Sequence, residues 1–145
     1  MVSPQKLAIY VIPILARLVE TAHEQGMYVI KHSDGNIMPL VEMLLGSGIN
    51  GLHPIDPNGG MSLGHMKKEY GRRVCLVGNV DCSYTLSWGT VEEVREEVKK
   101  CIREAATGGG YICTSSNSIR SSVKPENYIA MVEAIHEYGR YPIKL

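Results

Sequence analysis

Short apolar runs alternate with longer amphipathic segments along the chain. The runs fall at residues 27–30, 49–55, 74–77 and 111–113. They lack the in-and-out alternation of a sheet with one face in water, so they predict strands that are covered on both faces. The longer segments carry apolar residues at three-to-four spacing, which is typical of an amphipathic helix. The pattern therefore predicts strands and helices in alternation.

Five helices are expected around these strands. The first has Ser3 as its N-cap, is kinked or divided at Pro13 and ends at Gly26. Thr90 and Glu93 form a capping box ahead of another helix, because each side chain can bond the other residue's backbone N–H. The expected helices cover residues 4–25, 36–45, 61–70, 91–105 and 125–138.

Four strand-and-helix repeats after a leading helix are typical of a parallel α/β sheet covered by helices. Two architectures fit this pattern: a small doubly wound sheet, and half of an eight-stranded (β/α)8 TIM barrel. Neither a GxGxxG motif nor a GxxxxGK[ST] motif follows the first strand, which argues against a nucleotide-binding open sheet. A chain of 145 residues is expected to form a single domain over 1–145.

Composition excludes several classes of partner. The chain carries 15 basic and 15 acidic residues and no cluster of Lys and Arg, so neither nucleic acid nor an anionic membrane is an expected partner. The longest apolar stretch, residues 7–18, is short and interrupted, and no export signal precedes it, so a cytoplasmic location is expected. The four cysteines match no metal-binding spacing and are expected to be free thiols.

Polar side chains follow each apolar run at once. In chain order they are His32 and Asp34, His53 and Asp56, Asn79 and Asp81, and Ser116 and Asn117. Sites in parallel α/β proteins are built at the carboxyl ends of the strands, so these side chains are expected to share one face. The alternative is that they are turn residues and helix caps, which Asp, Asn and Ser favour. Two histidines and three carboxylates over four loops favour a shared site.

The individual residues keep more than one interpretation. His32 could be a metal ligand, an acid or base, or a histidine whose ring bonds the backbone. His53 could equally be a partly buried structural histidine or a site residue. Asp34 could orient a histidine, hold a metal or cap the next helix, which starts just after Gly35. The other histidines are expected to be surface or packing residues on helices: His23, His65 and His136.

Five motifs, in order and spacing, resemble the second half of the uroporphyrinogen decarboxylase and corrinoid methyltransferase superfamily. They cover nearly the whole chain and are His32–Asn36, Pro54–Pro57 with Gly60–Met61, Lys67–Gly71, Gly78–Asp81, and Gly109–Ile112 with Pro125–Asn127. The resemblance implies a (β/α)8 barrel of about twice this length, in which this chain supplies the last four strands.

The two branches of this superfamily differ at identifiable positions. The zinc methyltransferases carry His-x-Cys at a strand end and another Cys after the last strand, so that the metal activates a thiol. Here His32 is kept, but Asp34 and Asn117 take the cysteine positions. In the decarboxylases a histidine after the last strand contacts substrate, and Asn117 replaces it. These differences argue against both a sulfur-rich zinc site and porphyrinogen decarboxylation.

The resemblance leaves three functions open, led by a methyltransferase that acts with a corrinoid protein. The others are a decarboxylase-like lyase and a non-catalytic or truncated assembly subunit. His32, Asp34 and Asp81 are the expected catalytic residues, and His32 and Asp34 could hold zinc together with a ligand from the absent half. The expected substrate-binding residues are His53, Asp56, Asn79, Ser116 and Asn117.

Four parallel strands cannot close a barrel, so the chain is expected to be inactive alone. The first and last strands would each keep an unpaired edge, which normally must be covered. The expected cover is a second copy of the chain or a separately encoded first half.

Overall fold

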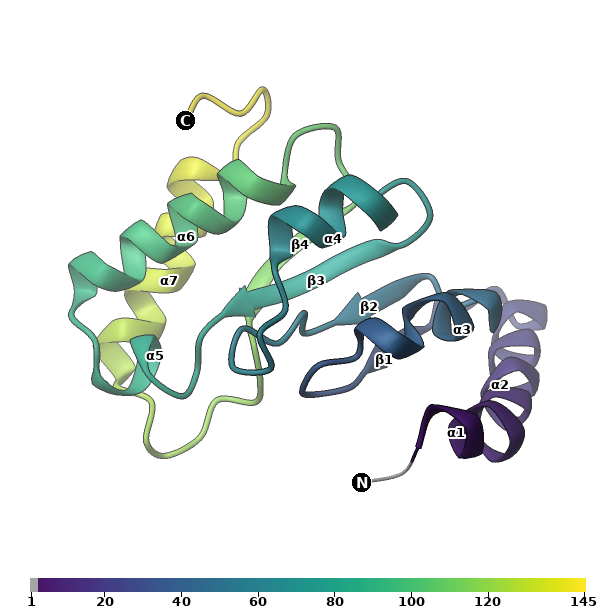
Figure 1. Ribbon diagram of the computed structural model, residues 1–145. Helices are drawn as coiled ribbons and strands as arrows, with labels where there is room; N and C mark the ends of the chain where they lie inside the picture. The colour runs from purple at the N-terminus through teal and green to yellow at the C-terminus, as the bar shows by residue number, and fades with distance from the viewer. Residues whose placement is uncertain (1–2) are drawn as a thin grey trace.

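The computed structural model describes residues 3–145 and contains a parallel sheet in the order β1-β2-β3-β4 (Figure 1). Each strand pairs with the next one along the chain, as in one half of a (β/α)8 barrel. The strands are β1 (Ile30–His32), β2 (Gly51–His53), β3 (Cys75–Val80) and β4 (Tyr111–Ser115). The prediction of an α/β fold with four parallel strands is confirmed.

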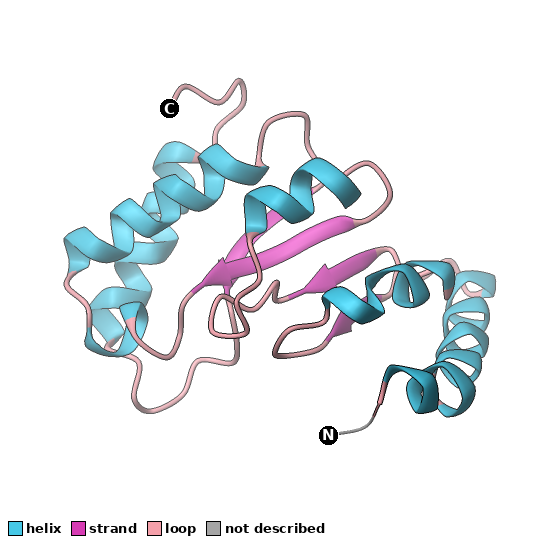
Figure 2. Cartoon of the chain, viewed as in Figure 1, coloured by secondary structure: helices cyan, strands magenta, loops and turns pink. Residues whose placement is uncertain are grey.

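Helices precede, connect and follow the strands. Figure 2 shows the first two helices beyond β1 and the last two at the other end of the row of strands. The helical elements are α1 (Pro4–Tyr10), α2 (Ile12–Glu24), the 3-10 turn η1 (Met38–Leu40), α3 (Val41–Gly46), α4 (Leu63–Tyr70), α5 (Thr85–Trp88), α6 (Val91–Ala105) and α7 (Pro125–Tyr138).

Local sequence signals explain where several helices begin. The Ser3 hydroxyl accepts a hydrogen bond from the Lys6 N–H at 3.3 Å, and α1 starts from this cap. The leading helix is divided as predicted, because Pro13 lies in the first turn of α2, where a missing N–H costs nothing. The capping box of Thr90 and Glu93 is present at the start of α6, with bonds of 2.8 and 3.2 Å.

Several predicted boundaries differ from the structure, and one short helix was missed. The first strand starts at Ile30 rather than residue 27, because the pairing with β2 begins there and the preceding Val29 N–H bonds the Asn50 side chain at 2.8 Å. The predicted helix over 36–45 divides into η1 and α3, with Pro39 inside the turn. The short helix α5 was not predicted, since four residues carry too little periodicity. His32, predicted just beyond its strand, is the last residue of β1, and His53, predicted inside its strand, is the last residue of β2.

The hydrophobic core lies between one face of the sheet and the helices. Leu52 and Leu76 of the sheet and Val94 and Val98 of α6 are fully buried there. On the other face Ile30 and Ile112 remain 52% and 49% exposed. We call this second face, with Tyr28, Ile30, Cys75 and Ile112, the open face. In a complete barrel it would line the interior.

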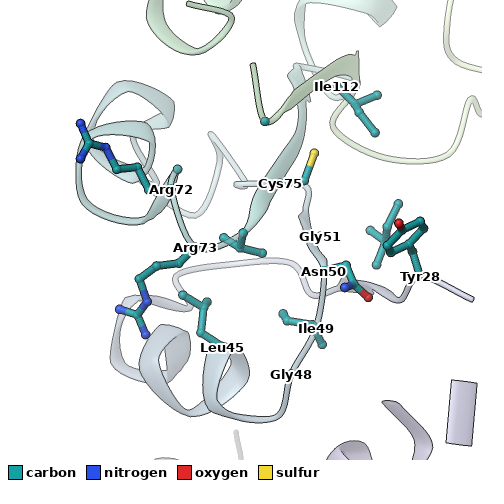
Figure 3. A pocket seen from close by; sticks show the side chains of 14 residues that line it. Tyr28, Leu45, Gly48, Ile49, Asn50, Gly51, Arg72, Arg73, Cys75 and Ile112 are labelled. Carbon is teal, nitrogen blue, oxygen red and sulfur yellow. The ribbon is translucent and has the colours of Figure 1, made fainter. Parts of the chain in front are cut away.

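A cavity of about 800 Å³ lies on the open face, near the starts of the strands (Figure 3). Its lining includes Tyr28, Ile30, Cys75 and Ile112, and Arg72 and Arg73 lie at its rim. In a complete barrel, side chains of the other strands would fill such a space. Within residues 3–145, no helix is both long enough and apolar enough to cross a membrane.

Candidate active site

Two histidine rings meet at the carboxyl end of the sheet. His32 and His53 end β1 and β2 and are paired in register. Their Nδ1 atoms lie 2.6 Å apart, and the ring centroids are separated by 4.8 Å. The histidines therefore interact directly, which the sequence did not predict because the predicted strand ends were misaligned.

Asp34 extends this contact toward the last strand. Its Oδ2 lies 3.3 Å from His32 Nε2, and its Oδ1 accepts a hydrogen bond from Asn117 Nδ2 at 3.1 Å. Asn117 follows β4, so the contact joins segments that belong to the two edge strands. We call His32, His53, Asp34 and Asn117 the His32 cluster. The side chains of His32 and Asp34 are 47% and 54% exposed, so both are in contact with solvent.

His53 connects the cluster to the backbone of β4. Its Nε2 lies 3.2 Å from the carbonyl oxygen of Ser115. Burial lowers the pKa of His53 more than the Ser115 carbonyl raises it, and the neighbouring His32 lowers it further. The surroundings of His53 therefore disfavour its charged form.

Asp56 and Asp81 hold the loops together. Asp56 Oδ2 accepts the backbone N–H of Gly35 at 2.7 Å, which ties the loop after β2 to the loop after β1. Asp81 Oδ1 accepts from Asn58 Nδ2 at 2.9 Å and from the backbone N–H of Ser83 at 2.7 Å. Both carboxylates thus make turn and loop contacts at the same edge as the His32 cluster, without belonging to it.

Asn79 and Ser116 lie away from the cluster. Asn79 Nδ2 donates to the Ile55 carbonyl at 2.8 Å, and Cys101 of α6 donates to Asn79 Oδ1 at 3.4 Å, so this side chain faces the helices. Ser116 Oγ accepts the backbone N–H of Cys82 at 3.1 Å. Only 7% of Asn79 and 5% of Ser116 is exposed. The structure does not bring these two predicted substrate-binding residues to the cluster, because their polar atoms bond within the fold.

Glu97 of α6 is a polar residue that the sequence analysis missed. Its Oε1 accepts the backbone N–H of Asp81 at 3.0 Å, while its buried Oε2 has no hydrogen-bond partner among the described residues. Burial raises the pKa of this carboxyl. The available signal was a glutamate three residues after Val94 and four before Cys101, which places it on the apolar side of the helix.

A family model described as uroporphyrinogen decarboxylase (URO-D) matches residues 1–138. The chain belongs to this family. The uroporphyrinogen decarboxylase of Methylobacillus flagellatus is 29% identical over 113 residues, which cover 73% of this chain and 31% of that protein. That of Pseudoalteromonas translucida is 32% identical over 79 residues, covering 54% of this chain and 22% of that protein.

A solved structure shares the fold of this chain. A methyltransferase from Methanosarcina mazei matches with a TM-score of 0.81 at 24% identity, over 97% of this chain and 39% of that one. At this identity the likeness shows the fold alone. This chain spans about a third of the length of the URO-D relatives it matches, so it corresponds to part of their barrel.

The described residues of this chain do not form a zinc site with cysteine thiolate ligands. Within residues 3–145, no three His, Cys, Asp or Glu side chains come together in a way that could hold a metal ion. His32 and Asp34 supply two donors, whereas structural and catalytic zinc sites use at least three protein ligands. Asn117 stands at the position of the later cysteine of the zinc methyltransferases, and its amide donates a hydrogen bond to Asp34. Cys82 is the nearby thiol, but it donates to the Asn117 carbonyl at 3.2 Å and is 6% exposed.

Proposed function

We propose that this chain is the C-terminal part of a URO-D family enzyme that transfers a methyl group between a small substrate and a corrinoid protein. The observation that carries the proposal is the meeting of His32, Asp34 and Asn117. These residues stand at the three positions where the resemblance to the zinc methyltransferases would have His-x-Cys and a later Cys. Their contacts of 3.3 and 3.1 Å support a common site without thiolates.

The chemistry of the pair suits the donor side of methyl transfer. When a methyl group leaves an oxygen or nitrogen atom of the substrate, that atom keeps the electron pair of the broken bond and must receive a proton. His32 Nε2–H can supply this proton, and the Asp34 carboxylate stabilises the charged imidazole that precedes the transfer. The corrinoid of the partner protein would accept the methyl group. The half-exposed His32 and Asp34 leave room for a cofactor carried on another protein.

A spectroscopic assay tests the proposal. The complete protein that contains this chain is mixed anaerobically with free cob(I)alamin and a series of methyl ethers and methylamines, and cobalamin methylation is followed by absorbance. The His32→Gln variant should lower the rate about 10²- to 10⁴-fold, the usual contribution of a positioned proton donor. The matched control is His65→Gln, on the exposed surface of α4, which should leave the rate unchanged. Absence of methylation with every substrate would contradict the proposal.

Decarboxylation is the second candidate, favoured by the curated relatives. Those compared above are uroporphyrinogen decarboxylases. In a decarboxylase the carbon that loses CO2 must take up a proton, which a His–Asp pair could also deliver. Incubation of the same protein with uroporphyrinogen, followed by chromatography of the oxidised porphyrins, separates the two functions. Products with fewer carboxyl groups would favour the decarboxylase.

A further inference from the structure

The loop after β2 begins with a strained residue. Ile55 has a φ of 57°, in the left-handed region that β-branched residues rarely adopt, and its side chain is fully buried. The Ile55 carbonyl accepts a hydrogen bond from Asn79 Nδ2 at 2.8 Å. Strain of this kind persists only where surrounding contacts over-determine it, and it is concentrated at functional sites. The residue that this conformation places is Asp56, which follows directly.

The Asp56 carboxylate bonds both its own loop and the loop after β1. Its Oδ1 accepts the backbone N–H of Asn58 at 2.9 Å, and its Oδ2 accepts that of Gly35 at 2.7 Å. The first bond fixes the carboxylate within its own loop, so the second can hold Gly35 in place. Gly59 of the same loop packs against Gly35, because a Cβ on Gly59 would lie 2.3 Å from the Gly35 carbonyl carbon.

Holding Gly35 also holds Asp34. The Gly35 N–H belongs to the planar peptide group that contains the Asp34 Cα, so the bond to Asp56 restrains the point from which the Asp34 side chain extends. On the other side of Asp34, the Ser33 N–H bonds the His53 carbonyl at 2.9 Å. From this position the Asp34 carboxylate lies 3.3 Å from His32 Nε2.

We infer that Asp56 is a positioning residue, which places the Asp34 carboxylate against His32 by holding the Gly35 N–H. This role differs from the substrate contact that the sequence predicted for Asp56, because both of its oxygens accept backbone N–H groups. The importance of the role for catalysis rests on the proposed function, whereas the placement of Asp34 does not.

Two substitutions separate the acceptor oxygens of Asp56 from the bulk of its side chain. Asp56→Leu keeps a side chain of similar size that cannot accept a hydrogen bond. Asp56→Asn keeps one oxygen, which can accept the Gly35 N–H. The matched control is Glu104→Leu, which removes a carboxylate that accepts the Gly64 N–H at 3.1 Å between α6 and α4, outside the His32 cluster.

Amide hydrogen exchange of the complete protein, read by nuclear magnetic resonance, tests the placement without any activity. In the wild type the Gly35 N–H should exchange roughly ten- to a hundredfold more slowly than an unbonded loop amide, as expected for a bond to a charged group. Asp56→Leu should abolish this protection, Asp56→Asn should keep part of it, and Glu104→Leu should leave it unchanged. A wild-type Gly35 amide that exchanges as fast as an unbonded one would overturn the inference with no variant needed.

A crystal structure of the folded Asp56→Leu variant tests the next step. The Asp34 carboxylate should have moved out of contact with His32 Nε2, whereas the Glu104→Leu variant should keep that contact. An Asp34 carboxylate that stays in place in the Asp56→Leu variant would contradict the inference.

The methyl-transfer assay measures the catalytic consequence. Asp56→Leu should lower kcat about 10- to 100-fold with little change in KM, as expected for a misplaced group, and Asp56→Asn should restore part of the rate. In an Asp34→Asn background, Asp56→Leu should have no further effect, because Asp56 acts through Asp34. Losses that simply add would contradict this role. Failure of the wild-type protein in the assay would count against the proposed function alone, since the exchange and crystallographic results are independent of it.

Discussion

The open face should prevent this chain from existing alone as a stable monomer. Ile30 and Ile112, on the two edge strands, are about half exposed. Complete burial of an isoleucine side chain stabilises by about 1.5–3 kcal/mol, so covering the exposed half contributes about 1 kcal/mol per side chain. A dimer of two half-barrels covers four such isoleucine side chains, two from each copy. Together they stabilise the dimer by about 4 kcal/mol. This corresponds to roughly a thousandfold in the dissociation constant.

Replacing both Ile30 and Ile112 by lysine tests this contribution. Ile30→Lys with Ile112→Lys should weaken association at least a thousandfold, because buried charge adds to the lost apolar burial. Light scattering coupled to size-exclusion chromatography, over a range of protein concentrations, measures the effect. The matched control is Trp88→Lys on α5, which changes a side chain that is 71% exposed and lies outside the open face.

The wild-type protein provides the decisive result. A homodimer that pairs β1 of one copy with β4 of the other supplies eight parallel strands and covers both edges. If a separately encoded first half exists, mixing should replace the homodimer with a complex of one copy of each. A monodisperse monomer at low micromolar concentration that unfolds cooperatively would refute the reasoning, since it would mean that the half-barrel protects its own edges.

Three further predictions follow from single contacts. The chain alone should retain well under one zinc per molecule after dialysis, as measured by elemental analysis, because it offers two convincing ligands; stoichiometric zinc would contradict this. Burial raises the pKa of Glu97 above its ordinary 4.5, so ionisation costs stability as the pH rises above that value. Glu97→Gln should therefore match the wild type in urea unfolding below about pH 4 and gain relative to it toward neutral pH; an equal loss at both would count against the buried charge. Gly59→Ala should destabilise by about 1–3 kcal/mol, because its Cβ would lie 2.3 Å from the Gly35 carbonyl carbon. Gly46→Ala, with nothing within 4 Å, should not destabilise the protein, and equal unfolding midpoints for the two variants would refute the loop contact.

The sequence predicted the architecture because the fold depends on patterns repeated over many residues. The capping box of α6 and its apolar face predict the same helix, and each strand begins in or directly follows a short apolar run of the sequence. The polar positions after the strands could be predicted for the same reason. His32 and Asp34 meet because they are two residues apart at a strand end, which needs no knowledge of long-range register.

The contacts between strands could not be predicted, because they depend on register and backbone direction. The pairing of His32 with His53 requires strand ends known to within one residue. Asn79 shows a second difficulty: strict alternation from Cys75 would point it at the open face, yet it bonds Cys101 of α6. The alternation is broken at Gly78, whose φ of 133° suits glycine and whose Cβ would lie 2.1 Å from the Pro54 carbonyl oxygen.

The His32 cluster is built from both edge strands of this chain. The contacts run from Ser115 of β4 through His53 and His32 to Asp34, and return to β4 at Asn117. The orientation of the His32 ring is therefore set by residues of this chain. The open face has no wall of its own, and the URO-D relatives are about three times as long as the matched part. If the proposed function is correct, substrate choice should depend on the residues that cover the open face, because the contacts that orient His32 all lie within this chain.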